Sequence, residues 1–158
     1  MKSKLALLKS EIRRDSDKLV RLYEKFNSSY SRFKQQKEYA FLVESAFYVN
    51  QIYTGFERMF RNVAESFENS IDEKSWHKSL LDRMAIGIDN IRPALISETS
   101  HKYLNELRAF RHFFRHTYDF DLDDEKFAIV AAGALALKKS FNPDIENFLR
   151  FIDKMLTD

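Results

Sequence analysis

The sequence predicts an all-α protein, and its composition and apolar periodicity are the main reasons. The 158 residues include only three glycines and two prolines, whereas 32% are charged. So few turn-forming residues favour long helices over a turn-rich sheet protein. A hydrophobic content of 44%, with 15% aromatic residues, is sufficient to fill a substantial core. We therefore expect residues 1–158 to form a single helical domain.

Two long helices are predicted in the first half of the chain. Between residues 5 and 26, apolar side chains follow alternating steps of three and four, with Asp15 in the one position that should be apolar. The polar residues 34–38 are the expected connection. From residue 42 to 67 the same alternation continues unbroken and predicts the longest core helix. Gly55 lies inside this helix, where close approach of a neighbouring helix explains it better than room for a ligand does.

A short helix and a longer one are expected next. Residues 69–72 are expected to end the second helix, and Trp76–Met84 has the pattern of a short amphipathic helix. Arg92 and Pro93 then break the chain, because a proline disfavours the helical conformation of the residue before it. The following helix carries most of the histidines. Acidic residues between 119 and 125 are expected to end that helix and to cap the next one.

The last part of the chain is predicted to contain two helices. Residues 127–137 are apolar enough for the segment to be largely buried. Asn142 is a good N-cap residue, and Pro143 suits the first position of a helix. A separate last helix is therefore expected to start there, with Ile145, Phe148, Leu149 and Ile152 facing inward.

Composition also excludes several classes of protein. The chain has no cysteine, so disulfides, thiolate metal sites and cysteine nucleophiles are excluded. The N-terminus lacks the pattern of a signal peptide, and no segment approaches the apolar length of a membrane span. The simplest expectation is a cytoplasmic protein without membrane association. A net charge of +2 is too small to predict nucleic-acid binding, so that prediction depends on local clustering.

Such a cluster occurs on one helix near residues 101–118. At about 100° per residue, three guanidinium groups, two imidazoles and a phenol share one arc of this helix. These side chains are Arg108, Arg111, His112, Arg115, His116 and Tyr118. Apolar side chains occupy the opposite arc and are expected to enter the core: Tyr103, Leu107, Phe110, Phe113 and Phe114. Guanidinium groups bind phosphate and imidazole exchanges a proton near neutral pH, so the arc suits phosphate chemistry.

Two other interpretations of the cluster need consideration. His112 and His116 are four residues apart, with Asp119 three further on, and this spacing could bind a divalent metal. The glutamate of a zincin helix is missing and neighbouring arginines would repel a cation, so we expect no metal. In the other interpretation, the arginines pair with carboxylates of neighbouring helices and have only a structural role.

The spacing of Arg111, His116 and Tyr118 resembles the Arg-x4-His-x-Tyr signature of HEPN ribonuclease domains, in particular the HepT toxin branch. The run Trp76-His77-Lys78-Ser79-Leu80-Leu81, the pair Arg92-Pro93 and the residues around Phe110 also look like HepT-like sequences. The similarity covers about residues 53–127. Many HEPN proteins have asparagine after the motif arginine, where this chain has His112. The resemblance implies a HEPN-type up-and-down helical bundle with additional short helices.

The resemblance also implies a function, namely the toxin of a type VII-like HEPN/MNT toxin–antitoxin pair. Such a toxin is a metal-independent RNA endoribonuclease that needs no cofactor. Arg111 and His116 would be catalytic, with His112, Arg115 and Arg108 supporting the RNA. Tyr118 would accept AMP from a minimal nucleotidyltransferase antitoxin, which silences the toxin. The family places two motif copies in a cleft between subunits, which implies a homodimer. The alternative is a catalytically inactive HEPN scaffold that binds a nucleotide, RNA or a protein partner.

Overall fold

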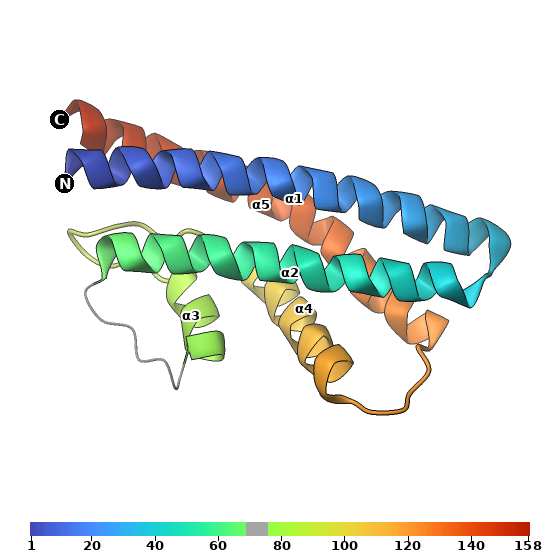
Figure 1. Cartoon of the computed structure of the whole chain (residues 1–158). Helices are drawn as coiled ribbons and strands as arrows, with labels where there is room; N and C mark the ends of the chain where they lie inside the picture. Colours follow the sequence, from blue (N-terminus) through green and yellow to red (C-terminus); the bar gives the residue numbers. More distant parts are fainter. Residues whose placement is uncertain (69–75) are drawn as a thin grey trace.

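A computed structural model describes residues 1–68 and 76–158, with side chains from residue 79 onward in the second range. These ranges contain five α-helices and no β-strand, which confirms the all-α prediction (Figure 1). The helices are α1 (Lys2–Gln36), α2 (Tyr39–Phe67), α3 (Trp76–Met84), α4 (Glu98–His116) and α5 (Asp124–Thr157). Among them, no helix is long and apolar enough to cross a membrane.

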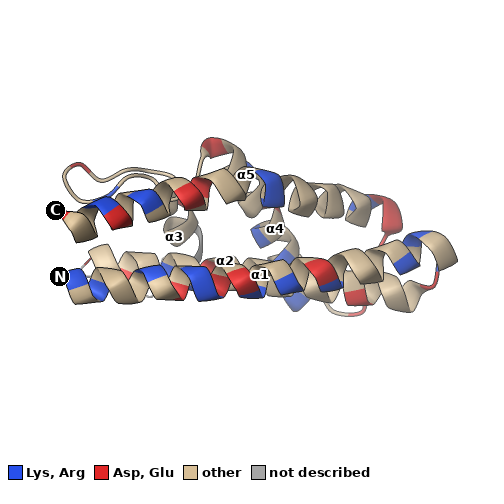
Figure 2. Ribbon diagram, turned by 90° about the horizontal axis from the view of Figure 1, so that it is seen from above, with Lys and Arg blue, Asp and Glu red and all other residues tan. Residues whose placement is uncertain are grey.

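The long helices form the body of the molecule, and the short ones cover one side of it. Helices α1 and α2 run side by side in opposite directions, and α5 packs obliquely against both of them (Figure 1). Helix α4 packs against both α2 and α5 on the side away from α1. Basic and acidic residues are interspersed along α1, as seen in Figure 2. The arginine and histidine residues predicted to share one arc, from Arg108 to His116, lie on α4.

The hairpin of α1 and α2 is tight because of one turn residue and one glycine. Lys37 ends α1 in the left-handed conformation, with φ of 57°, and α2 begins two residues later. A Cβ atom on Gly55 would lie 2.9 Å from Leu19 Cδ2, so glycine permits close approach of the helices, as predicted. Asp15 is buried as its position in the apolar series predicts, and it accepts a hydrogen bond from Asn62 at 3.3 Å.

A buried arginine holds the connection between α3 and α4. The side chain of Arg92 is fully buried and donates to the Glu68 carboxylate at 2.8 Å. It also donates to the backbone carbonyls of Arg83 and Ile86. The predicted break at Arg92 is confirmed, because the helix of residues 76–84 ends before it and α4 starts after it. This guanidinium ties the end of α2 to the segment that leads into α4.

The start of α4 is fixed by a side chain from α5. Ser97 is the N-cap, and its hydroxyl accepts a hydrogen bond from the Ser100 backbone N–H at 3.2 Å. The Asp144 carboxylate accepts from the Ser97 backbone N–H at 3.0 Å and from the Ser100 hydroxyl at 2.5 Å. A carboxylate at this end also stabilises the helix dipole. The contacts set where α4 starts relative to α5, and hence where its later residues lie.

The prediction of a separate last helix at Asn142 and Pro143 is wrong. Helix α5 runs without interruption from Asp124 to Thr157 and contains Pro143. An internal proline costs about 3 kcal/mol, because it removes one backbone hydrogen bond and crowds the preceding turn. The same face of the helix buries Phe141 before the proline and Ile145 after it. Burial of two such side chains contributes about 1.5–3 kcal/mol each, enough to offset the cost of the proline.

The first turns of α5 and the end of α2 bear on three further predictions. Residues 127–137 are less buried than predicted, because only one face of α5 is covered there and Ile129 on the other face is 70% exposed. Asp123 caps α5 as expected, since its carboxylate accepts a hydrogen bond from the Lys126 backbone N–H. The helix end predicted at residues 69–72 lies outside the described residues, although α2 ends at Phe67.

Candidate active site

The cationic arc of α4 lines a hollow of about 230 Å³ between α4 and α2. Leu104 and Leu107 are fully buried and orient α4, so that its cationic side faces the hollow rather than the core. We call it the cationic hollow. Its lining residues are Glu57, Arg108, Arg111, His112, Arg115 and His116. Every predicted site residue except Tyr118 therefore lies in one place.

Arg111 is the most firmly held cation of the hollow. Its Nη1 donates to Glu57 Oε2 at 3.2 Å, and the two side chains are only 16% and 9% exposed. The guanidinium carbon also lies 5.6 Å from the centroid of the Tyr53 ring, a cation–π distance. Contacts with a carboxylate and an aromatic face restrict the orientation of the guanidinium. One nitrogen is occupied by Glu57, and the planar group has further N–H donors for a phosphate.

Tyr53 forms the floor beneath Arg111 and remains neutral. Burial raises the pKa of Tyr53 well above its ordinary value, and Glu57 raises it further, whereas Arg108 and Arg111 oppose the rise. The phenol therefore carries its proton throughout the physiological pH range. It contributes an aromatic face against the Arg111 guanidinium and no negative charge.

The two histidines of the hollow are stacked on each other. The ring centroids of His112 and His116 are 4.3 Å apart, with 25° between the ring planes. His116 Nδ1 lies 2.9 Å from the backbone carbonyl oxygen of His112. A carbonyl can only accept, so Nδ1 carries the hydrogen in this contact. In the neutral ring Nε2 is then the basic nitrogen, available to take a proton.

Positive charge predominates in the cationic hollow. Arg108 donates through Nη2 to the side-chain oxygen of Asn105 at 2.9 Å, which fixes its guanidinium along α4 without neutralising it. Arg115 is exposed. In the described ranges, neither Arg108 nor Arg115 forms an ion pair with a carboxylate. Three guanidinium groups thus face the single carboxylate of Glu57, and the excess favours an anion.

Tyr118 does not lie on α4, contrary to the helical-wheel prediction. The helix ends at His116, Thr117 is extended, and Asp119 is left-handed with φ of 51°. Carboxylates destabilise the negative end of a helix dipole, which explains why the helix stops before the acidic segment. The Tyr118 side chain is 96% exposed. Its angular position relative to Arg111 therefore cannot be inferred from helix periodicity.

The other two histidines, His101 and His77, are not part of the cationic hollow as described. His101 Nε2 contacts Asp82 Oδ1 at 2.7 Å and so connects α4 to the end of α3. The side chain of His77 lies outside the described residues. The sequence interpretation missed Glu57 and Tyr53 as parts of the site. Glu57 follows Tyr53 by four residues and so lies on nearly the same face of α2. An acidic residue on a helix face that otherwise enters the core is a signal that could have identified Glu57.

The comparison with protein families identifies one relationship. The sequence pattern of the family described as "HepT-like protein" matches residues 44–152, well over half of the chain. The matched range includes α3 and α4 and every residue of the cationic hollow. Comparisons with curated proteins and with solved structures gave no significant match. On the family match, the chain belongs to the HepT-like branch of the HEPN family.

Proposed function

We propose that this protein is a metal-independent RNA endoribonuclease. The observation that carries the proposal is the cationic hollow, where Arg111 is held beside two stacked histidines. Guanidinium groups bind phosphate oxygens, and an imidazole with a free Nε2 can remove a proton near neutral pH. Membership of the HepT-like family supports this reaction class. RNA is the substrate class that supplies both a phosphate and an adjacent hydroxyl.

The reaction requires one bond to form and one to break at phosphorus. Nε2 of His116 takes the proton of the ribose 2′-hydroxyl, and the 2′-oxygen forms a bond to the adjacent phosphorus. The bond between phosphorus and the 5′-oxygen breaks, which leaves a 2′,3′-cyclic phosphate. The departing 5′-oxygen takes up a proton, for which His112, the second imidazole of the hollow, is the proposed source in addition to its role in supporting the RNA. Arg111 stabilises the charge that accumulates on the non-bridging oxygens.

The other arginines hold the RNA in this scheme. Arg115 is exposed at the edge of the hollow, and Arg108 lies about two turns earlier on α4. Contacts to neighbouring phosphates would fix the scissile bond without chemistry of their own. Together the three guanidinium groups supply the positive charge that many nucleases obtain from metal ions.

We further propose that the active form is a homodimer. A hollow of about 230 Å³ has room for a phosphate and part of a ribose, and is smaller than typical pockets for whole small-molecule ligands. Pairing two hollows would produce a cleft for a longer RNA segment. Sedimentation over a broad concentration range is expected to show a dimer. A chain that remains monomeric at every concentration would contradict the paired arrangement.

The proposed toxin is silenced by transfer of AMP to Tyr118. A minimal nucleotidyltransferase is the proposed antitoxin that transfers it, and both proteins are proposed to act in the cytoplasm. The phenol is 96% exposed and follows His116 by only two residues. An attached AMP would add bulk and negative charge near the hollow and compete with RNA phosphates. Incubation with the partner and ATP is expected to increase the intact mass by AMP units, and Tyr118→Phe should abolish the increase. Tyr48→Phe, which removes the same hydroxyl from a half-buried tyrosine of α2, is the control and should leave the mass increase unchanged. Modification that persists in Tyr118→Phe would refute the assignment.

A catalytically inactive HEPN scaffold is the second candidate. The observation in its favour is the nearly buried ion pair of Arg111 and Glu57, which a purely structural role would also produce. The two candidates differ when purified native protein is incubated with cellular RNA. Binding accompanied by cleavage supports the endoribonuclease, whereas stable binding without cleavage by unmodified protein supports the scaffold.

A further inference from the structure

A second pocket lies on the opposite side of α4 from the cationic hollow. It has a volume of about 380 Å³ and is enclosed by α4, the segment before α5 and the first turns of α5. We propose that this pocket binds a helical segment of a partner protein that carries a large apolar side chain flanked by lysine or arginine. The inference concerns a different surface from the proposed active site and does not depend on nuclease activity.

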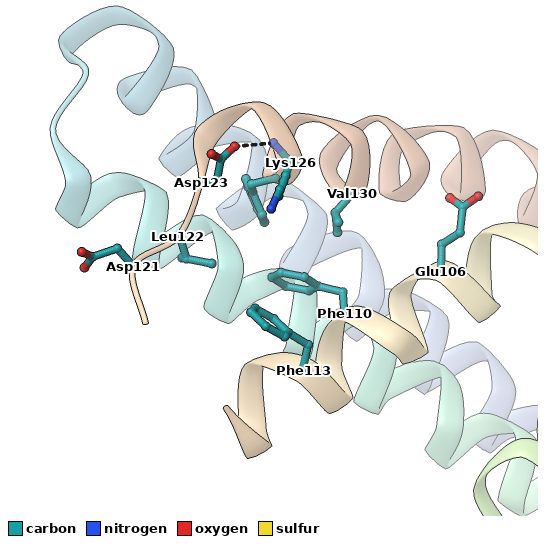
Figure 3. Close-up of a pocket in the computed structure, with 9 residues that line it drawn as sticks. Glu106, Phe110, Phe113, Asp121, Leu122, Asp123, Lys126 and Val130 are labelled. Atoms are coloured by element: carbon teal, nitrogen blue, oxygen red, sulfur yellow. Dashed lines mark hydrogen bonds between the residues drawn. The ribbon is translucent and has the colours of Figure 1, made fainter. Parts of the chain in front are cut away.

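Aromatic side chains form the floor of the pocket. Figure 3 shows Phe110 and Phe113 pointing from α4 into the space between Leu122 of the connecting segment and Val130 of α5. Phe127 is buried, and its ring centroid lies 5.6 Å from that of Phe110. Phe113 was predicted to enter the core, yet it is 46% exposed. The apolar arc of α4 is therefore only partly covered, and the uncovered part lies in a concave site.

The floor is already organised before anything binds. The rings of Phe113 and Phe120 pack edge to face with centroids 4.9 Å apart, and Phe114 also contacts Phe120. The Leu122 backbone N–H donates to the Tyr39 hydroxyl at 2.8 Å, which ties the wall of the pocket to α2. A preformed floor lowers the cost of ordering on binding. The volume is sufficient for one large aliphatic or aromatic side chain and part of the helix that carries it.

The rim of the pocket is acidic. Glu106 and Asp121 are exposed at opposite ends of the pocket (Figure 3), and Asp123 lies between them along the wall. Lys126 is the one basic residue of the lining. An apolar floor with an excess of carboxylates around it complements an apolar anchor with cationic neighbours. The same charges disfavour RNA, so the two sides of α4 select different partners.

The proposal can be tested with a synthetic amphipathic helix composed of leucine and lysine, labelled with a fluorophore. Fluorescence anisotropy is expected to show saturable binding that weakens as salt increases. Phe113→Ser should weaken binding by about tenfold or more, because it removes the exposed part of the apolar floor. Glu106→Lys/Asp121→Lys should weaken it to a similar extent. A leucine and glutamate helix should bind much more weakly to the native protein.

The matched control is Glu24→Lys/Glu65→Lys, which replaces two exposed carboxylates outside the pocket and changes the net charge equally. This variant is expected to bind the peptide nearly as well as the native protein, and circular dichroism checks that each variant is folded. Equal weakening in the control would attribute binding to overall charge and overturn the proposal. The proposal is also overturned if the native protein does not bind the peptide, or if Phe113→Ser abolishes self-association, since a second copy would then occupy the pocket.

Discussion

Replacement of His116 by alanine is expected to reduce RNA cleavage by about 10²–10⁴-fold, the usual contribution of a positioned general base. The structure supplies the reason, because the His112 carbonyl orients Nδ1 of His116 and leaves Nε2 as the basic nitrogen. RNA binding should change little, since the guanidinium groups of the hollow remain. Single-turnover cleavage and RNA binding, measured on the same preparation, separate the two effects.

His101→Ala is the matched control for this experiment. His101 lies on the same helix but contacts Asp82, away from the cationic hollow. Its removal is expected to leave the cleavage rate close to the native rate. Equal losses in the two variants would attribute the effect to the stability of α4, and full activity in His116→Ala would contradict the assignment of this imidazole as the base.

The second large effect is expected for Arg111→Lys. The substitution retains a positive charge near Glu57, so the nearly buried carboxylate keeps a cation and the fold should persist. An ammonium group cannot donate to Glu57 and to two phosphate oxygens in the planar arrangement of a guanidinium. We therefore expect a loss of about 10²–10³-fold in cleavage, as for removal of one donor that stabilises transition-state charge.

The effect of Arg111→Lys should appear mainly in kcat, because the interaction is strongest when charge accumulates at phosphorus. Arg111→Ala is a poorer test, since it leaves Glu57 with less compensation in a buried position and combines lost stability with lost activity. Glu57→Gln is a useful companion, and a smaller loss is expected because Arg111 keeps its charge and its contact with Tyr53. If Arg111→Lys retained the native kcat, a point charge at this position would be sufficient for cleavage, and the role assigned to the planar guanidinium would be wrong.

Much of the fold is predictable from periodicity, because a sustained heptad pattern specifies both a helix and its buried face. The buried positions of α2, such as Val49, Phe56 and Val63, follow the apolar series. Gly55 marks the close approach of α1, because a Cβ atom at this position would crowd Leu19. Pro143 shows the limit of local signals, since an N-cap and proline pair predicts a start while flanking core residues keep α5 continuous.

The candidate site is partly predictable. Helical periodicity alone places Arg108, Arg111, His112, Arg115 and His116 on one arc, and the structure brings them into one hollow. Periodicity cannot show that Glu57 of α2 packs against Arg111, because that contact depends on how the two helices cross. It also misplaces Tyr118, which belongs to the helix by motif spacing but follows its last turn.

The most direct test of the central claim is incubation of purified, unmodified protein with cellular RNA in excess EDTA, followed by chemical identification of the RNA ends. Intact mass first establishes that Tyr118 carries no AMP. The proposed function predicts cleavage without metal that leaves 2′,3′-cyclic phosphate and 5′-hydroxyl ends. Intact RNA under these conditions, or cleavage that leaves 5′-phosphate ends, would contradict the assignment of the cationic hollow as a metal-independent ribonuclease site.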